Sequence, residues 1–468
     1  MKKITLSVAA LGLVASANAA EALAAMFSEG KASGQIREYS VDRLYQGSAG
    51  NTTHRKANAV GGYLKFDTAE YKGLSFGTGV YTTNGFFNDR DITNTSKVDA
   101  TLFGPNNSNI TYFGELYVNF KYKNTSFKGG RQKINTPMAA ADDARMLPDL
   151  FEAFMFTNKD IKDTTITLGH ITKFNQGTFG RVYDGYDNQM AAPLGNRTEE
   201  QRKAGARANG LLSVTSGYSY YDTKDQVGSF VNVGRYAFNK ETAGVTVAAL
   251  NYSGVENLKL QLWNYYAHDM ANTVYAQADY AFGAIPSTQV KPYASGQLIK
   301  QNSVGDEIAG SVDSLYVAAK AGAKVENFDA YVAYSTIGKN SESEKAIGTA
   351  NAIITPMGGI PAFTQGMVTR HMFLAGTDAS KVAASYNFTD VAGKLLASAY
   401  YTSFNMDANS GYGVARTASE SGFDMIYNPE LVANLELRVR GNFPRDFFEG
   451  ANGSTGWDEY RLIVNYNF

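Results

Sequence analysis

The chain contains no cysteine, and its formal net charge is only −1. The absence of cysteine excludes a disulfide framework and any metal or redox site built on thiolates, although an exported protein could have used both. The balanced charge leaves no basic surface of the kind that nucleic acids require, so nucleic acid is not an expected partner. Selectivity based on charge must therefore be local.

Long apolar runs are also missing beyond the first residues. No later stretch approaches the ~20 consecutive apolar residues that a transmembrane helix needs. Yet 44% of the residues are hydrophobic, and the chain has 30 tyrosines and 27 phenylalanines. If such a chain enters a membrane, it does so as strands. Because no Pro/Ser-rich linker or charge block divides it, we expect one domain over residues 20–468, although length alone would suggest more.

The first 19 residues have the organisation of a signal peptide. Lys2 and Lys3 precede an apolar run that ends at Ala15, and Ala17-Asn18-Ala19 follows as an A-x-A cleavage site. A membrane-spanning first helix is the alternative, but the apolar run is too short for one. The mature chain should begin near Ala20.

The final segment alternates in polarity with a period of two. One face carries Tyr460, Leu462, Val464, Tyr466 and Phe468, and the other carries Glu459, Arg461, Ile463, Asn465 and Asn467. This period is that of a β-strand with one oily and one mostly wet face. A strand that ends in Phe is typical of outer-membrane barrels, and the segment 435–443 alternates in the same way.

Strands of this kind recur, joined alternately by short turns and by long polar connections. The long connections lie near 84–108, 175–243, 339–378 and 444–456. Transmembrane barrels alternate short periplasmic turns with long outer loops. On this rule we assign 18 strands, near 34–45, 58–69, 73–83, 109–122, 125–134, 149–158, 164–174, 244–253, 257–267, 271–282, 288–301, 313–325, 327–338, 379–388, 393–405, 421–428, 433–443 and 458–468.

The pattern therefore predicts an all-β fold, a transmembrane antiparallel β-barrel of about 18 strands. A soluble β-sandwich is the alternative, which the number of strands and the turns disfavour. A barrel of this size can hold a water channel, so strand number points to transport. The segment 228–238 is also strand-like, and we expect it to form a hairpin arm within the long outer loop 175–243.

Basic side chains fall on the wet face of several predicted strands. A lipid-facing Arg near the bilayer midplane costs about 2–4 kcal/mol, so these side chains should line the lumen. They are Arg438, Arg440, Arg461, Arg37, Lys121 and Lys259. We interpret them as a track that attracts a substrate of opposite charge. The alternative is that they pair with Glu115, Glu436 and Glu459 and only solvate the wall.

The most specific motif begins with Gly130-Arg131-Gln132-Lys133-Ile134-Asn135-Thr136-Pro137 and continues with Asp142-Asp143-Ala144-Arg145-Met146-Leu147-Pro148. It resembles the substrate-selective outer-membrane porins of the OprD family, in which G-R-Q-x-x-x-T-P leads into D-D-x-R-M-x-P. The strand Leu437-Arg438-Val439-Arg440 adds to this resemblance. The motif and this strand are specific, whereas the other features fit many barrels.

The resemblance implies that the third outer loop, at 134–148, folds into the barrel and narrows the pore opposite the basic row. It also implies solutes that bear a carboxylate, such as amino acids or organic acids. Asp142, Asp143 and Arg145 would lie in this loop, and the two aspartates could equally only brace it, for instance by pairing with Arg145. Arg131 matches the motif and is grouped with this loop, although its parity with Phe127 would turn it outward unless Gly129-Gly130 forms a bulge.

An outer-membrane enzyme and a surface adhesin or receptor built on the long loops are the rival classes. The four histidines, His54, His170, His268 and His371, lie in no G-x-S-x-G or H-E-x-x-H setting. We therefore expect no catalytic residue, and no metal or cofactor. The expected protein is a porin of the Gram-negative outer membrane for passive diffusion of small solutes, monomeric or weakly trimeric. Its expected partners are membrane lipid and the barrel-assembly machinery.

Overall fold

The computed structural model describes residues 17–46, 52–86, 97–104, 107–178, 227–238, 240–345, 351–389, 391–409, 415–450 and 453–468. The first strands are β1 (Lys31–Gln46), β2 (Thr52–Asp67), β3 (Leu74–Gly85), β4 (Ile110–Tyr122), β5 (Thr125–Gln132), β6 (Leu150–Asn158), β7 (Thr164–Asn175), β8 (Val231–Asn232), β9 (Val245–Tyr252) and β10 (Leu258–Ala267). The others are β11 (Ala271–Ala281), β12 (Val290–Ser303), β13 (Asp313–Val325), β14 (Phe328–Ile337), β15 (Thr377–Phe388), β16 (Gly393–Met406), β17 (Arg416–Pro429), β18 (Leu435–Arg445), β19 (Phe448–Gly450) and β20 (Gly453–Asn467). The helices are α1 (Ala17–Ser28), α5 (Val233–Phe238) and α6 (Glu342–Lys345), with 3-10 turns η2 (Ala100–Leu102) and η6 (His371–Phe373).

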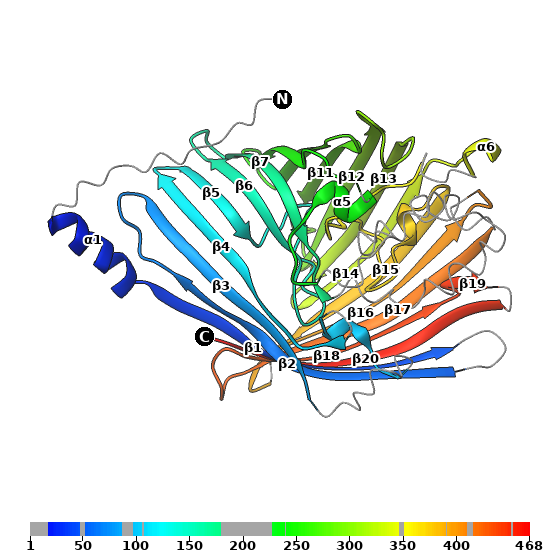
Figure 1. The fold of residues 1–468 in the computed structure, drawn as a ribbon. Coiled ribbons are helices and arrows are strands. Elements are labelled where there is room, and N and C mark those ends of the chain that lie inside the picture. Colours follow the sequence, from blue (N-terminus) through cyan, green and yellow to red (C-terminus); the bar gives the residue numbers. More distant parts are fainter. Residues whose placement is uncertain are drawn as a thin grey trace.

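The strands form one closed antiparallel barrel (Figure 1). Successive strands pair around the ring, and β20 pairs with β1 to close it, with Arg461 opposite Val41. Of the 20 strands, β8 and β19 are short additions, so 18 strands make up the wall within the described residues. The barrel predicted from the alternating sequence is confirmed, and its strand bounds differ from the predicted ones by only a few residues in most cases.

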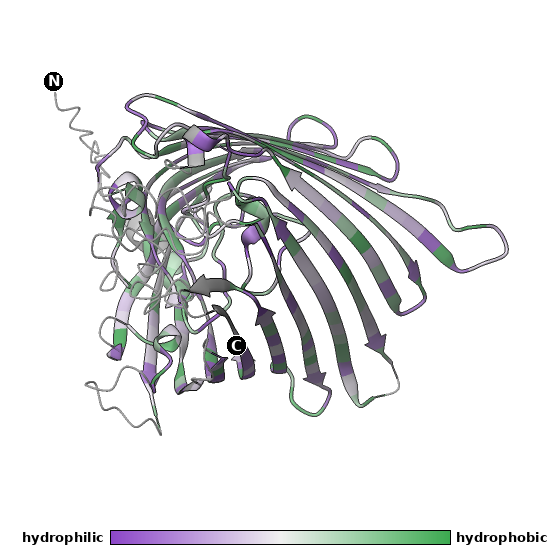
Figure 2. Ribbon diagram, turned by 90° about the vertical axis from the view of Figure 1, so that its right-hand side faces the viewer, coloured by the Kyte–Doolittle hydropathy of each residue, from purple (hydrophilic) through white to green (hydrophobic). Residues whose placement is uncertain are grey.

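The two faces of each strand differ as the sequence predicts. In β20 the even-numbered Tyr460 and Leu462 are about half exposed, whereas the odd-numbered Arg461 and Ile463 are buried. Figure 2 shows the same alternation of hydrophilic and hydrophobic positions along the strands. Because successive side chains of a strand point to opposite faces, one set faces lipid and the other faces the lumen.

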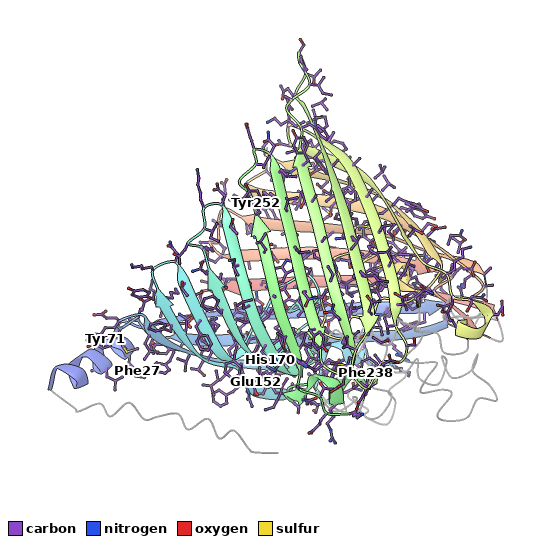
Figure 3. The ribbon with its side chains drawn as sticks, turned by 90° about the horizontal axis from the view of Figure 1, so that it is seen from above. Phe27, Tyr71, Glu152, His170, Phe238 and Tyr252 are labelled. Carbon is purple, nitrogen blue, oxygen red and sulfur yellow. The ribbon has the colours of Figure 1, made fainter. Side chains whose placement is uncertain are left out.

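Short and long connections lie at opposite ends of the barrel. The links 123–124 and 326–327 have two residues each, and their first residues, Lys123 and Glu326, take a φ of 51°. Such left-handed residues give the two-residue hairpins that match the twist of a sheet. In Figure 3, Tyr71 and Tyr252 mark the end with short links, and His170 and Phe238 mark the end with long ones.

The lumen is partly filled by inserted connections, which share the buried apolar core with the wall strands. Ile353, Val368, Met372 and Phe373 come from the connection between β14 and β15, and they pack against inward side chains such as that of Tyr316. A second cluster joins Met146 and Leu147, from the connection between β5 and β6, to Tyr39 and Tyr81 on the wall. The core of this protein is therefore built between loops and the wall.

Two predictions concern segments outside the wall. The strand-like segment 228–238 does not span the membrane, but the predicted hairpin arm was wrong: only β8 pairs, with Lys173 and Phe174 of β7, and α5 follows. The predicted signal peptide lies mostly in residues 1–16, which are outside the described residues, and the cleavage site falls within α1. Cleavage near Ala20 therefore stays a prediction. Among the described helices, none is long and apolar enough to cross a membrane.

Candidate functional site

The third outer loop, residues 133–149, enters the barrel as predicted. Ile134, Met138, Met146 and Leu147 are buried. The loop folds back on itself through a bridge between Asn135 and Ala140. Because its apolar side chains are covered by the wall and by another loop, it holds a fixed place in the lumen. We call residues 133–149 the constriction loop.

Arg37 on β1 fastens the constriction loop to the wall. Its Nη1 lies 2.7 Å from Oδ1 of Asp143 and donates to the carbonyl of Arg145 at 2.6 Å. Lys133 lies 3.8 Å from the other oxygen of Asp143. Burial alone would raise the pKa of Asp143, but Arg37, Lys133 and Arg438 outweigh it and hold that pKa below its usual range. Asp143 is therefore a carboxylate in the lumen.

Arg145 from the constriction loop reaches a fully buried carboxylate, Glu459 of β20. Its Nη2 lies 2.6 Å from Oε1 of Glu459. Arg43 and Arg461 also pair with Glu459, at 2.8 and 2.5 Å. A buried carboxylate is costly unless it is fully paired, and three guanidinium groups meet that need. Arg461 thus faces inward as predicted, but it is an interior ion-pair partner with 0% of its side chain exposed.

Arg438 and Arg440 of β18 share one carboxylate, that of Asp424 on β17. Arg438 Nε donates to Oδ1 at 2.8 Å, and Arg440 Nε lies 3.1 Å from Oδ2. Both keep part of the side chain exposed, 26% for Arg438 and 14% for Arg440. The register sets Arg440 opposite the inward-facing Arg461. These two arginines therefore face the lumen beside a single acidic partner.

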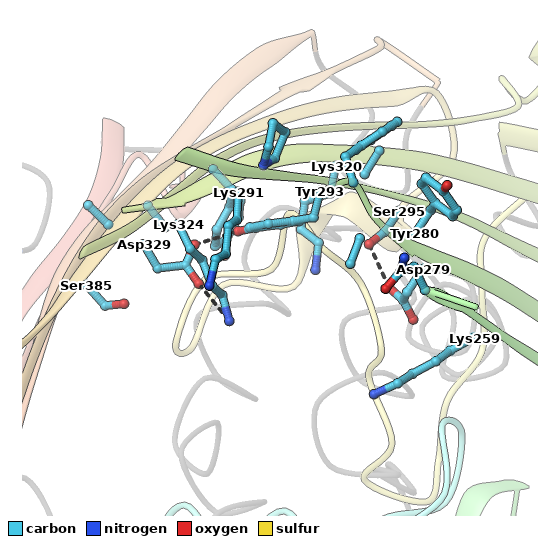
Figure 4. A pocket seen from close by; sticks show the side chains of 18 of the residues that line it. Lys259, Asp279, Tyr280, Lys291, Tyr293, Ser295, Lys320, Lys324, Asp329 and Ser385 are labelled. Atoms are coloured by element: carbon cyan, nitrogen blue, oxygen red, sulfur yellow. Dashed lines mark hydrogen bonds and ion pairs between the residues drawn. The ribbon is translucent and has the colours of Figure 1, made fainter. Parts of the chain in front are cut away.

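Lys121 and Lys259 also lie on the inner face, near the end with short links. Lys121 has the parity of the buried Glu115 and Tyr117 on β4. Lys259 lines a lumenal cavity of about 1110 Å³, which Figure 4 shows from close by. The cavity also holds Lys320, whose Nζ lies 4.6 Å from the ring centre of Phe363. Basic residues thus line the middle of the path through the barrel and its end with short links.

Arg131 does not face the lumen. It lies opposite Leu116 on β4, and the register of β5 runs without a bulge on either side, although Gly130 has a φ of 122°. Because Leu116 is exposed on the outer wall, Arg131 points outward too. Grouping Arg131 with the constriction loop was therefore wrong. Arg131 faces the same side of β5 as Phe127, as the alternation of the strand predicts.

A second inserted segment, residues 351–376, was not predicted from the sequence. We expected the connection 339–378 to be an outer loop, but this part of it lies inside the barrel. It pairs with the constriction loop through Ala139 and Gly358, and Nη2 of Arg370 lies 3.5 Å from Oδ2 of Asp142. The sequence did hold a signal, because apolar residues such as Ile353-Ile354 and Met372-Phe373-Leu374 are unusual in an exposed loop.

Glu420 of β17 holds this second segment in place. The backbone N–H groups of Met367 and Thr369 each donate to its carboxylate at 2.7 Å, and that of Val368 at 3.3 Å. The hydroxyl groups of Thr369 and Tyr400 donate to it as well. Hydrogen bonds to an ionised acceptor are about twice as strong as neutral ones. One buried carboxylate therefore fixes a whole turn of the segment.

Comparison with known proteins supports this architecture. Residues 25–191 match the family described as outer membrane porin, OprD family. The fold is shared with OpdK of Pseudomonas aeruginosa, solved with vanillate, at 14% identity over 95% of this chain and 99% of that chain, with a TM-score of 0.70. OccK9 (OpdG) of the same organism is 16% identical, and the match covers 95% of this chain and 99% of that chain with a TM-score of 0.70. A BenF-like porin from Pseudomonas fluorescens Pf-5 is also 16% identical, with the same two coverages and a TM-score of 0.69. No curated protein matches the chain.

The barrel and its inserted loops, together with these matches, define an outer-membrane porin. The resemblance read from the loop motif is therefore matched over residues 25–191 by the OprD family of outer-membrane porins, and the fold of the barrel is shared with OpdK and OccK9.

Proposed function

We propose that this porin conducts small solutes that bear a carboxylate, such as amino acids or organic acids, along the basic residues of its wall. The observation that carries the proposal is that one carboxylate in the lumen is shared by two partly exposed cations. Asp424 pairs with both Arg438 and Arg440. Because one carboxylate cannot neutralise two cations, the pair keeps a net positive charge that attracts a passing anion.

The partial exposure of Arg438 and Arg440 also supports the proposal. A charge pair at about 4 Å is worth about 1 kcal/mol in bulk water and about 4 kcal/mol at an effective dielectric of 20. Passage needs the weaker end of this range, because a solute must leave as well as enter. Side chains that are already partly neutralised, as these two are by Asp424, suit weak successive binding. Vanillate, with which OpdK was solved, is itself a carboxylate.

We infer transport rather than catalysis. Of the histidines, His371 is buried and its Nε2 lies 3.1 Å from the carbonyl of Phe447, and His54 pairs with Asp42 on the outer side of β1. Neither arrangement provides a nucleophile with its base. Ester or peptide hydrolysis that depended on a histidine would contradict this inference. A role of the long loops as an adhesin would rest mainly on residues 179–226, which are outside the described residues.

Planar bilayers test the proposal directly. Purified protein should give conductance steps, and a salt gradient should give a reversal potential of the sign for anion preference. Uptake by liposomes should be faster for amino acids, dicarboxylates or aromatic acids than for uncharged sugars of the same size. Absence of conductance steps would contradict a channel of any kind. Steps with cation preference would contradict the conduction of carboxylates but not the formation of a channel.

A further inference from the structure

Three charged side chains interrupt the apolar outer wall at the outer ends of β5, β6 and β7. They are Arg131, Glu152 and Lys173, and we call them the outer-wall cluster. The register sets Arg131 opposite Glu152, and Glu152 opposite Lys173. They therefore form one row across three strands, on the face that carries the exposed Leu116 and Phe154.

The cluster lies at the boundary between the lipid-facing girdle and the outer loops. Arg131 is the last residue but one of β5, and Lys173 is close to the end of β7 at Asn175. Both strands lead into long connections at this point. Further down the same face lie the exposed Phe127, Phe154 and Leu168. An outward charge costs little at this depth, where lipid head groups replace acyl chains.

The cluster carries more positive than negative charge. Nε of Arg131 lies 3.9 Å from Oε2 of Glu152, and Nζ of Lys173 lies 2.9 Å from Oε1. Within the described part of the chain, Glu152 is the one carboxylate paired with either cation. The other contacts of Arg131 are the carbonyl of Phe113 at 3.3 Å and the ring of Phe230 at 4.3 Å, which bring no negative charge. Two cations thus share one carboxylate, and 38% and 42% of their side chains are exposed.

Two histidines extend the cluster along the same face. His170 Nδ1 lies 3.2 Å from the hydroxyl oxygen of Thr246, and His268 Nε2 lies 3.0 Å from the same oxygen. His170 is opposite Phe154, which is the next outward residue of β6 after Glu152. Figure 3 labels His170 and Glu152 close together. Imidazole N–H groups are donors that an anion can use.

We propose that the outer-wall cluster binds the phosphate of an anionic lipid of the outer leaflet, with Arg131 and Lys173 as the main ligands. Arg suits a phosphate because its planar fork donates two parallel hydrogen bonds, and Lys adds a point charge. The position of the cluster selects a lipid over a free anion. The acyl chains of the same molecule would lie along Phe154 and Leu168, directly beside the charged row.

The test compares lipid binding by variants of the full-length protein. Bisphosphorylated lipid A in detergent is titrated against wild type and against R131Q/K173Q, and bound lipid is counted by native mass spectrometry. Loss of two surface cations should weaken binding at least about tenfold. The matched control is K300Q, which removes an outward lysine from β12 that pairs with its own carboxylate, Asp313. K300Q should bind as wild type does.

Further arms identify the source of the phosphate. Dephosphorylated lipid A should bind wild type no better than it binds R131Q/K173Q, and millimolar inorganic phosphate should not displace the lipid. Equal binding by wild type and R131Q/K173Q would overturn the proposal, as would displacement by inorganic phosphate. Single-channel conductance should be unchanged in R131Q/K173Q, because the cluster lies outside the lumen. The result of the lipid-binding test is therefore independent of which solute the channel transports.

Discussion

Arg37 and Asp143 form an ion pair, with 2.7 Å between Nη1 and Oδ1, that joins the barrel wall to the constriction loop. The same guanidinium donates to the side chain of Asn465 on the neighbouring strand at 2.8 Å. Arg37 therefore connects the closing seam of the barrel to the element that narrows it. A residue expected to attract substrate thus also positions the loop.

Replacement of Asp143 by Asn should loosen the constriction loop. The variant leaves Arg37 buried without its ion pair, a loss of about 1–3 kcal/mol. We expect a larger and noisier single-channel conductance. D313N, which alters an exposed aspartate on the outer wall, is the control and should conduct as wild type does.

The same pair predicts how wild type responds to pH. The pKa of Asp143 is below its usual range in the folded protein, so the pair's stabilisation is complete above a pH of about 4 and is lost as pH falls through the lowered value. Conductance should therefore stay constant from pH 7 to about pH 4 and rise only below it. A rise between pH 6 and 5 would show that Asp143 does not hold the loop.

Replacement of Glu420 by Ala should release residues 351–376 from the lumen. Three consecutive backbone N–H groups and two hydroxyl groups would lose their acceptor, and we expect a cost of about 3 kcal/mol or more. Conductance should increase, and protease should cut within 351–376 in the variant but not in wild type. E326Q, in a short turn, is the matched control. Unchanged conductance and protection in E420A would refute the role of Glu420.

Replacement of both Arg438 and Arg440 by Gln should lower anion preference and slow carboxylate uptake. Asp424 would remain without its cations, which turns a local excess of positive charge into a negative one. The reversal potential in a salt gradient should shift toward that of a cation-selective pore. An unchanged potential would mean that the two arginines only solvate the wall, which is the alternative that the sequence left open.

His371 should make the folded barrel less stable in mild acid. Burial lowers its pKa to about 3 against the opposing contact with the carbonyl of Phe447. An unfolded histidine takes up a proton near pH 6.5, so the folded state loses stability as pH falls from there toward 3. The free energy of unfolding should be about 2 kcal/mol lower at pH 5 than at pH 7.5 from this group. H371Q should lose most of this difference in denaturant titrations, whereas the control H54Q should keep it.

The sequence by itself determined the wall of this protein. A period of two along each segment decides which side chains face lipid, and the cost of a charge in lipid turns Arg438, Arg440 and Arg461 inward without any knowledge of their neighbours. The same rule turns Arg131 outward, and grouping this residue with the constriction loop on the strength of the family motif was wrong. Local geometry was sufficient because β-pleating acts residue by residue.

Only the tertiary structure decided what fills the lumen. That Glu459 gathers three arginines, and that Glu420 accepts from a turn in 351–376, depends on strands and loops far apart in the sequence. Ion pairs form between whichever charges the closed barrel brings within a few ångströms, and parity says only that each faces inward. The sequence could therefore place Arg461 in the lumen but not show that it is buried against Glu459, because closure of the ring sets these distances.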